Sequence, residues 1–147
     1  MNQLTTVRLD LIGLGNMGQS HARSIIDGKV PGLELTAVAD QDAERLEPFK
    51  EVAHFNDGLE LIKSGSVDAI LIATPHYSHT TLGIAALEAG IDTLVEKPIS
   101  VHKEDCERPI AAWQNKDVVF SAMFNRRNDP AYCKVKSLIE SGELDSM

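Results

Sequence analysis

Residues 7–27 read VRLDLIGLGNMGQSHARSIID, and this stretch decides the fold. It opens with an apolar run of strand length, Val7–Ile12, and continues with a helical pattern, Asn16–Asp27, that Gly28 closes. Between the two lies the turn Gly13–Gly18, GLGNMG, which matches the pattern GxGxxG. A glycine-rich turn directly after a strand and at the start of a helix is typical of a βαβ unit that binds a dinucleotide.

Each residue of this turn has its own expected task. Gly13 permits the tight turn, Gly15 lets the backbone approach a pyrophosphate, and Gly18 lets the helix pack closely on the strand. The backbone N–H groups around Asn16 and Met17 are expected to face the phosphates, with the helix dipole favouring the negative charge. The alternative interpretation is a plain strand-to-helix turn without a ligand.

Strands and helices alternate along the rest of the chain. Further strands are predicted at Leu33–Ala39, Val52–Phe55, Ala69–Ala73, Thr93–Val95 and Val118–Ser121, and further helices at Gln41–Lys50, Leu59–Lys63, between Ala73 and Glu88, Val101–Trp113 and Asp129–Ser141. This alternation predicts a Rossmann-type α/β fold, a doubly wound and mostly parallel sheet with helices on both faces. Residues 1–122 would form the dinucleotide-binding domain, and residues 123–147 a connecting segment and a helix leading to a C-terminal substrate domain absent from this chain.

Two residues conflict locally with this scheme. Asp10 lies in a strand that is predicted to be buried, where an unpaired carboxylate is costly. It lies near a strand edge or has a partner, and the sequence leaves both open. Pro109 falls inside the helix predicted over Val101–Trp113, and an interior proline kinks or breaks a helix at about 3 kcal/mol. We expect a break there.

Asp40 follows the second predicted strand, where an acidic residue of this fold accepts hydrogen bonds from the adenosine ribose hydroxyls. A carboxylate at this place also repels the 2′-phosphate of NADP. Asp42 lies nearby and Arg45 is the single close basic residue, so NAD is favoured over NADP. The alternative is an aspartate of a turn that faces solvent.

Polar residues follow two later strands, at the edge of the sheet where ligands bind in doubly wound folds. Thr74-Pro75-His76-Tyr77-Ser78-His79 comes after the fourth strand and Glu96-Lys97-Pro98 after the fifth. The two histidines have three readings: a metal pair without a convincing third ligand, exposed or capping residues, or contacts to cofactor or substrate. The Glu-Lys pair is either a surface ion pair or a group that faces the ligand crevice, where the lysine would polarise a substrate oxygen.

The composition is acidic, because 14 Lys and Arg side chains stand against 22 Asp and Glu and give a net charge of −8. This charge repels nucleic acids and anionic membranes, so neither is an expected partner. Cys106 and Cys133 lack the spacing of a metal site, and no metal is expected. The N-terminus does not read as a signal peptide, and no segment approaches about 18 apolar residues, so cytoplasmic residence is expected.

With these motifs the chain resembles the cofactor-binding half of the Gfo/Idh/MocA family (glucose–fructose oxidoreductase, inositol dehydrogenase, MocA). The resemblance is carried by GLGNMG at Gly13–Gly18, Asp40, VDAILIATP at Val67–Pro75, His79, ALEAG at Ala86–Gly90, EKP at Glu96–Pro98, FNRRNDPAY at Phe124–Tyr132 and the helix ending in SLIESGEL. It runs from about Thr6 to Leu144, and EKP followed by the Arg-Arg segment is its most specific part.

The resemblance implies roles for residues outside the glycine turn. Thr74 and Pro75 would line the nicotinamide end of the cofactor, and His79 matches a histidine of the family's segment there. Arg126 would lie near the cofactor at the domain junction. His76 departs from the family, which more often has asparagine, so its role is open.

The resemblance also implies roles for the Glu-Lys pair. Glu96 and Lys97 would lie beside the nicotinamide, Lys97 would also reach the substrate hydroxyl, and the Lys97–Pro98 bond would be cis. The expected cofactor-binding residues are thus Gly13, Gly15, Asn16, Met17, Gly18, Asp40, Thr74, Pro75, His79, Glu96, Lys97 and Arg126, with Lys97 as the catalytic residue.

The implied function is an oxidoreductase that oxidises or reduces a sugar, polyol or related secondary alcohol by hydride transfer with NAD. Family members carry a second α/β domain that shapes the substrate pocket and usually makes the dimer interface. The isolated chain is therefore expected to be inactive, and homo-oligomers through the exposed domain junction are expected. The alternatives are a non-catalytic NAD-binding sensor or assembly module, a truncated remnant, and a non-redox use of NAD.

Overall fold

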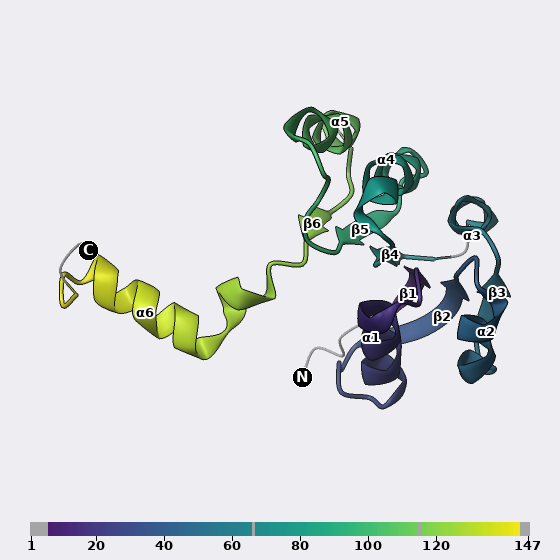
Figure 1. Cartoon of the computed structure of the whole chain (residues 1–147), viewed down its shortest axis with the longest axis horizontal. Coiled ribbons are helices and arrows are strands. Elements are labelled where there is room, and N and C mark those ends of the chain that lie inside the picture. The colour runs from purple at the N-terminus through teal and green to yellow at the C-terminus, as the bar shows by residue number, and fades with distance from the viewer. Residues whose placement is uncertain (1–5, 66, 115, 145–147) are drawn as a thin grey trace.

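The computed structural model describes residues 6–65, 67–114 and 116–144. Six parallel strands form one sheet in the order β3-β2-β1-β4-β5-β6 (Figure 1). The strands are β1 (Val7–Ile12), β2 (Leu33–Ala39), β3 (Ala53–Phe55), β4 (Ala69–Ile72), β5 (Asp92–Val95) and β6 (Phe120–Ala122). The chain winds outward in one direction from β1 to β3 and in the other from β4 to β6, which confirms the predicted doubly wound Rossmann-type fold.

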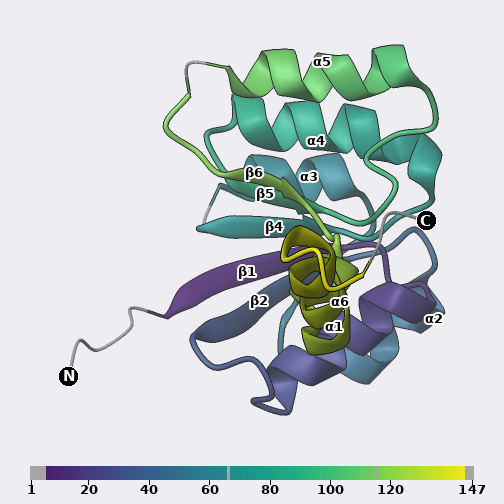
Figure 2. The same ribbon diagram turned by 90° about the vertical axis from the view of Figure 1, so that its left-hand side faces the viewer.

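Helices cover both faces of this sheet (Figure 2). The α-helices are α1 (Asn16–Ile26), α2 (Ala43–Leu46), α3 (Gly58–Ser64), α4 (His79–Glu88), α5 (Lys103–Trp113) and α6 (Pro130–Glu140), and the 3₁₀ helices are η1 (Glu47–Phe49), η2 (His76–Ser78) and η3 (Asn125–Asn128). Helices α3, α4 and α5 lie on one side and α1 and α2 on the other, whereas α6 extends away from the sheet (Figures 1 and 2).

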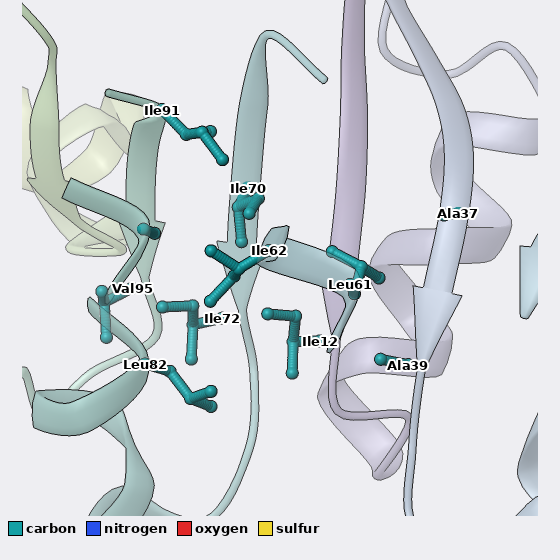
Figure 3. Close-up of a cluster of buried hydrophobic side chains, with 11 residues drawn as sticks. Ile12, Ala37, Ala39, Leu61, Ile62, Ile70, Ile72, Leu82, Ile91 and Val95 are labelled. Atoms are coloured by element: carbon teal, nitrogen blue, oxygen red, sulfur yellow. The ribbon is translucent and has the colours of Figure 1, made fainter. Parts of the chain in front are cut away.

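Each face of the sheet has its own apolar core. On one face, Ile12, Ile70 and Ile72 of the strands meet Leu61 of α3 and Leu82 of α4 (Figure 3). On the other face, side chains of β1, β2 and β4 pack against α1, α2 and η1, in a cluster of Leu9, Leu11, Leu14, Ala22, Ile25, Leu35, Val38, Leu46, Phe49 and Leu71. A strand buried on both faces reads as an unbroken apolar run, which explains the sequence of β4.

Proline and aspartate set the ends of the shorter helices. The helix predicted over Gln41–Lys50 is instead α2 followed by η1, and Pro48, which lacks a backbone N–H, lies at the start of η1. Helix α3 begins after Asp57, whose Oδ1 accepts hydrogen bonds from Leu59 N at 2.8 Å and Glu60 N at 3.0 Å. Gly58, the first residue of α3, lies against Ile12 at the end of β1.

The expected break at Pro109 is wrong, because α5 runs from Lys103 to Trp113 with the proline inside. Proline has no N–H to donate to the carbonyl of Asp105, four residues earlier. That oxygen instead accepts a hydrogen bond from Thr80 Oγ1 of α4 at 3.4 Å. The proline ring is fully buried and faces Gly83 of α4. Packing against α4 thus compensates for the missing backbone hydrogen bond.

Asp10 is buried, with 2% of its surface exposed, and it has a partner. Its Oδ1 accepts a hydrogen bond from Thr36 Oγ1 on the neighbouring strand at 2.6 Å. Burial raises the pKa of this carboxyl above its usual value, because the charged form loses its hydration. Strand β1 also has an irregular register with β2 between Leu9 and Asp10, next to this contact.

The stability of the domain should depend on Asp68 in acid. The Arg8 side chain donates to Asp68 at 2.8 and 3.1 Å and, together with the Arg8 backbone N–H, lowers the pKa of Asp68 to about 2. Since the folded-state pKa lies below the ordinary 3.8, the pair stabilises the fold above that value and is lost as the pH falls toward 2. Denaturant unfolding measures the free energy of unfolding of the parent and of Asp68→Asn. The difference between the two should therefore shrink as the pH falls from above 3.8 toward 2.

A difference between parent and Asp68→Asn that is the same at about pH 5 and about pH 2 would contradict this prediction. Asp10 acts in the opposite direction: its pKa is raised in the folded state, so its contribution improves as the pH falls. The comparison with Asp68→Asn isolates the Asp68 effect, because Asp10 is the same in both proteins.

Within residues 6–65, 67–114 and 116–144, no helix has the length and apolar character that crossing a bilayer requires.

Candidate cofactor site

A cavity of about 930 Å³ lies at the carboxyl edge of the sheet, where the strand order reverses between β1 and β4. This is the place where doubly wound folds bind their ligands. The glycine turn, the end of β2, the start of α3 and the loop from β4 to α4 form its walls. The lining residues are Ile12, Gly13, Gly15, Asn16, Met17, Ala39, Asp40, Gln41, Asp42, Arg45, Asn56, Asp57, Gly58, Leu59, Ala73, Thr74, Pro75, Tyr77, Ser78, Thr81 and Leu82.

The three glycines of the turn have different surroundings. Gly13 has φ +95°, and a Cβ on it would lie 2.7 Å from Thr74 N, so both its conformation and its space exclude a side chain. A Cβ on Gly18 would collide with the carbonyl oxygen of Gly13. Gly15 is the opposite case, since a Cβ there meets nothing within 4 Å and Gly15 lines the cavity. Gly13 and Gly18 shape the turn, whereas Gly15 leaves room for a ligand.

Replacing Gly15 with valine should therefore remove cofactor binding and keep the fold. The added side chain occupies space that is open in the structure, where a pyrophosphate would approach the backbone. We expect NAD affinity to fall by about 100-fold, with little change in the unfolding midpoint. Calorimetric titration and thermal unfolding measure the two quantities, and unchanged NAD affinity would contradict the phosphate-binding role of the turn.

Asp40 connects the end of β2 to the glycine turn. Its Oδ2 accepts a hydrogen bond from Leu14 N at 2.6 Å, and its Oδ1 accepts one from Asp42 N at 2.9 Å. Arg45 Nη1 lies 3.7 Å from Asp40 Oδ2, and Arg45 Nε lies 3.2 Å from Asp42 Oδ2. Two carboxylates thus face one guanidinium on this wall, so the local charge disfavours a further phosphate group and suits the neutral ribose hydroxyls of NAD.

The loops that follow β4 and β5 run side by side. Ile72 pairs with Val95 in the parallel register, and Glu96 N donates to Ile72 O at 2.8 Å. Thr74 and Lys97 each come two residues after this pair, at adjacent strand ends. Adjacent strands are about 4.8 Å apart, so both loops begin at neighbouring points of the carboxyl edge of the sheet. Thr74 belongs to the lining, whereas Lys97 lies outside it with its side chain exposed.

Glu96 is buried, with 7% of its surface exposed, although it stands at the end of a strand. Its Oε1 lies 2.7 Å from Nε2 of His21, and its Oε2 accepts a hydrogen bond from Lys97 N at 3.1 Å. The Lys97–Pro98 peptide bond is cis, as predicted. The carboxylate is thus engaged by the protein itself, and its proposed contact with the cofactor stays a prediction.

His21 is a residue that the sequence reasoning missed. It lies on α1, three residues after Gly18. Gly18, Ala22 and Ile25 are the buried residues of this helix and mark its sheet-facing side. A histidine at the border of this sheet-facing side was the available signal, since a polar group there needs a partner. Its pairing with Glu96 links the helix of the glycine turn to the turn that carries Lys97.

His79 is buried, with 1% of its surface exposed, at the first position of α4. Its Nε2 lies 2.8 Å from the carbonyl oxygen of Thr74, and its Nδ1 lies 2.9 Å from that of Pro98. His79 is outside the cavity lining, so its link to the cavity runs through Thr74, and direct cofactor contact stays a prediction. His76 is exposed and lies edge-on to the His79 ring at 5.5 Å. Among the described residues, no group of three or more His, Cys, Asp or Glu is arranged to hold a metal ion.

Arg126 is not brought to the cavity. It lies on η3 and is exposed, its Nη1 is 3.7 Å from Asp129, and its guanidinium lies over the Tyr132 ring at 5.4 Å. With α6 this segment extends away from the sheet (Figure 1). Arg126 lines a second cavity of about 420 Å³ instead, together with Arg127, Tyr132, Cys133 and Lys136. A role of Arg126 at the cofactor stays a prediction.

Comparison with known proteins gives the same result as the geometry. The family described as "Oxidoreductase family, NAD-binding Rossmann fold" (Gfo/Idh/MocA) matches residues 7–124. Inositol 2-dehydrogenase 1 of Saccharopolyspora erythraea is 35% identical over 145 residues, which are 95% of this chain and 43% of that protein.

Two solved structures share the fold. Myo-inositol 2-dehydrogenase of Lactobacillus plantarum superposes with a TM-score of 0.90 at 27% identity, covering 97% of this chain and 43% of that one. Scyllo-inositol dehydrogenase of Lactobacillus casei, with bound cofactor NAD(H) and scyllo-inositol, gives a TM-score of 0.86 at 29% identity and covers 97% and 43% of the two chains.

The chain spans less than half the length of the curated relatives it matches. The match includes the glycine turn, Asp40 and the loop after β4, which contribute to the cavity lining, and also the loop after β5. The chain belongs to the Gfo/Idh/MocA family of oxidoreductases, as an NAD-binding Rossmann domain.

Proposed function

We propose that this domain works in an NAD-dependent oxidoreductase that oxidises a secondary alcohol of a polyol of the inositol type. The observation that supports the proposal is the register of β4 and β5, by which the loops carrying Thr74 and Lys97 begin at adjacent strand ends, and Thr74 and Pro75 line the cavity. The relatives and solved structures named above are inositol dehydrogenases and support the substrate class.

The residues divide into those that bind the cofactor and one that acts on the substrate. Gly13, Gly15 and Gly18, with the N–H groups around Asn16 and Met17, would hold the pyrophosphate at the start of α1. Asp40 would accept hydrogen bonds from the adenosine ribose. Its Oδ2 already binds Leu14 N, so the same carboxylate would hold the turn and the ribose together.

Lys97 would orient the alcohol at the nicotinamide end, next to Thr74 and Pro75. The Lys97 ammonium would donate a hydrogen bond to the substrate oxygen and favour the negative charge that develops there. The O–H proton would pass to a base in the part of the working protein that covers this corner, as the hydride passes to NAD. NAD supplies the hydride acceptor. Water must be excluded from this corner, and since the Lys97 side chain is exposed, we propose that a partner or a further part of the working protein covers it during the reaction.

The proposal is tested by assaying the protein in its full natural length with NAD and a panel of inositols, linear polyols and sugars, following NADH absorbance. We expect NADH to form with at least one inositol and to depend on both reactants. NAD binding without NADH formation on any member of the panel would contradict the proposed reaction.

A second candidate function is a non-catalytic NAD-binding sensor or assembly module, and one observation favours it. Helix α6 exposes Tyr132, Val135 and Ile139, and none of its residues is buried. Monomeric proteins rarely leave such apolar faces bare. We propose that this surface is covered in the working protein, as a domain junction or in a homo-oligomer, in the cytoplasm.

A further inference from the structure

Two histidines hold the turn Glu96–Pro98 from two different helices. His21 of α1 bonds to the Glu96 side chain at 2.7 Å, and His79 of α4 lies 2.9 Å from the carbonyl oxygen of Pro98. The lysine between these two anchor points is exposed and, among the described residues, has no ion-pair partner. The backbone on either side of Lys97 is therefore fixed while its ammonium is free.

The hydrogen atoms of these contacts can be assigned from the chemistry of the acceptors. A carboxylate oxygen only accepts, so Nε2 of His21 carries the proton and donates to Glu96. Glu96 Oε2 then accepts from Lys97 N at 3.1 Å, which continues the chain of contacts to the lysine backbone. A carboxylate as buried as Glu96 is costly without such partners, so removing His21 should free the turn to rearrange.

His79 connects the same turn to the cavity wall. The oxygens on its two sides, from Thr74 and Pro98, are carbonyl groups and also only accept. The ring donates to both as an imidazolium and to one of them as a neutral imidazole. As an imidazolium the buried side chain thus bonds the loop after β4 to the loop after β5, whereas the neutral ring bonds to one loop and only contacts the other.

We propose that His21 and His79 are positioning residues that aim Lys97 at the nicotinamide end of bound NAD. This inference rests on the proposed function, in which Lys97 acts at that end. His21 holds the turn Glu96–Pro98 at a fixed distance from α1, whose N-terminal end would bind the pyrophosphate. His79 holds the same turn against the loop that contains Thr74. Both reference points touch the cofactor cavity, so the lysine is placed relative to the cofactor itself.

The experiment compares NAD with ADP-ribose, which has the adenosine, the pyrophosphate and the second ribose but no nicotinamide. The chain is labelled with ¹⁵N, and the backbone signal of Lys97 is followed as each ligand is added. In the parent chain we expect NAD to shift the Lys97 signal and ADP-ribose to leave it nearly unchanged. In His21→Ala and His79→Ala the NAD-specific shift should be lost, while ADP-ribose affinity stays within about twofold of the parent.

Two further variants separate positioning from a general structural role. His21→Gln keeps an N–H donor toward Glu96 and should restore the NAD-specific shift. His54→Ala is the matched control, because His54 also bonds to a carbonyl, that of Phe49 at 2.8 Å, but belongs to β3 and not to the cavity lining. It should behave as the parent chain does with both ligands.

The outcomes distinguish this inference from the proposed function. An NAD-specific Lys97 shift that survives in both alanine variants overturns the positioning role alone. Equal loss of NAD and ADP-ribose affinity in those variants also overturns it, because the histidines would then support the whole cavity. A parent chain in which NAD and ADP-ribose affect Lys97 alike overturns both. If the alanine variants do not fold, the ring signals of His21 and His79 in the parent must respond to NAD and not to ADP-ribose.

Discussion

The 147-residue chain, expressed by itself, should bind NAD and oxidise polyols at no measurable rate. Residues of the glycine turn, Asp40 and the Thr74–Pro75 wall line the cavity, so we expect the chain to bind the cofactor. Lys97 is exposed and outside the cavity lining, and the chain spans less than half the length of the inositol dehydrogenases it matches, so we expect it to lack groups that orient the alcohol. Correct orientation of the reactants lowers the activation barrier by about 7–11 kcal/mol, so its loss should lower turnover by at least about 10⁵-fold.

The measurement is NADH absorbance with the chain, NAD and the polyol panel, at a chain concentration where calorimetry shows the cofactor bound. A full-length inositol dehydrogenase of the same family, assayed alongside, is the positive control. Turnover by the short chain within about tenfold of that control would contradict the prediction. It would mean that residues 1–147 make a complete active site.

Replacing Lys97 with methionine in the full-length protein should lower kcat by about 10²–10⁴-fold. Methionine keeps the length of the side chain and removes the ammonium that would hold the substrate oxygen. NAD affinity should change little, because Lys97 lies outside the cavity lining. Steady-state kinetics measures kcat, and calorimetry measures the cofactor affinity.

The matched control is Lys103→Met. Lys103 is also an exposed lysine, at the start of α5, with Glu107 as its ion-pair partner at 3.5 Å, and it does not line the cavity. This variant should retain the kcat of the parent. If Lys97→Met retained it as well, the lysine would have no part in the chemistry.

The sequence predicted the strands best where apolar runs are long and buried on both faces. The predicted bounds of β1 and β2, Val7–Ile12 and Leu33–Ala39, are those of the structure. At the edge of the sheet, the strand predicted at Val118–Ser121 lies instead at Phe120–Ala122, because edge strands are short and half exposed and their pattern is weak. The sequence pattern therefore predicts strand bounds well for strands buried on both faces and less well for edge strands.

Long-range contacts explain the remaining differences. Pro109 does not break its helix because α4 supplies a hydrogen bond from Thr80 and a packing surface at Gly83, and both lie more than 20 residues away. His21 and Glu96 are 75 residues apart in the chain, so no local pattern indicates that they pair. Asp10 likewise has its partner, Thr36, on another strand. Such pairs become visible only when the topology is known.

The site shows the same division. The glycine turn, Asp40 and Thr74-Pro75 were predicted at the ligand site from their place after strands. Asp40, Thr74, Pro75 and most of the turn line the cavity, whereas Gly18 packs against Gly13 and does not. The loop that begins at Glu96 was also placed at this edge correctly by strand order. Burial of the His79 and Glu96 side chains was not predictable, because it depends on carbonyl and imidazole groups from other elements.

We propose that this cavity binds NAD with Asp40 at the adenosine ribose. Calorimetric titration of the chain with NAD and with NADP tests this most directly. The Asp40 and Asp42 carboxylates face a single guanidinium, so a 2′-phosphate adds repulsion that the ribose hydroxyl does not. NAD is predicted to bind more tightly than NADP by about tenfold or more. Equal or tighter binding of NADP would contradict the placement of Asp40 at the ribose.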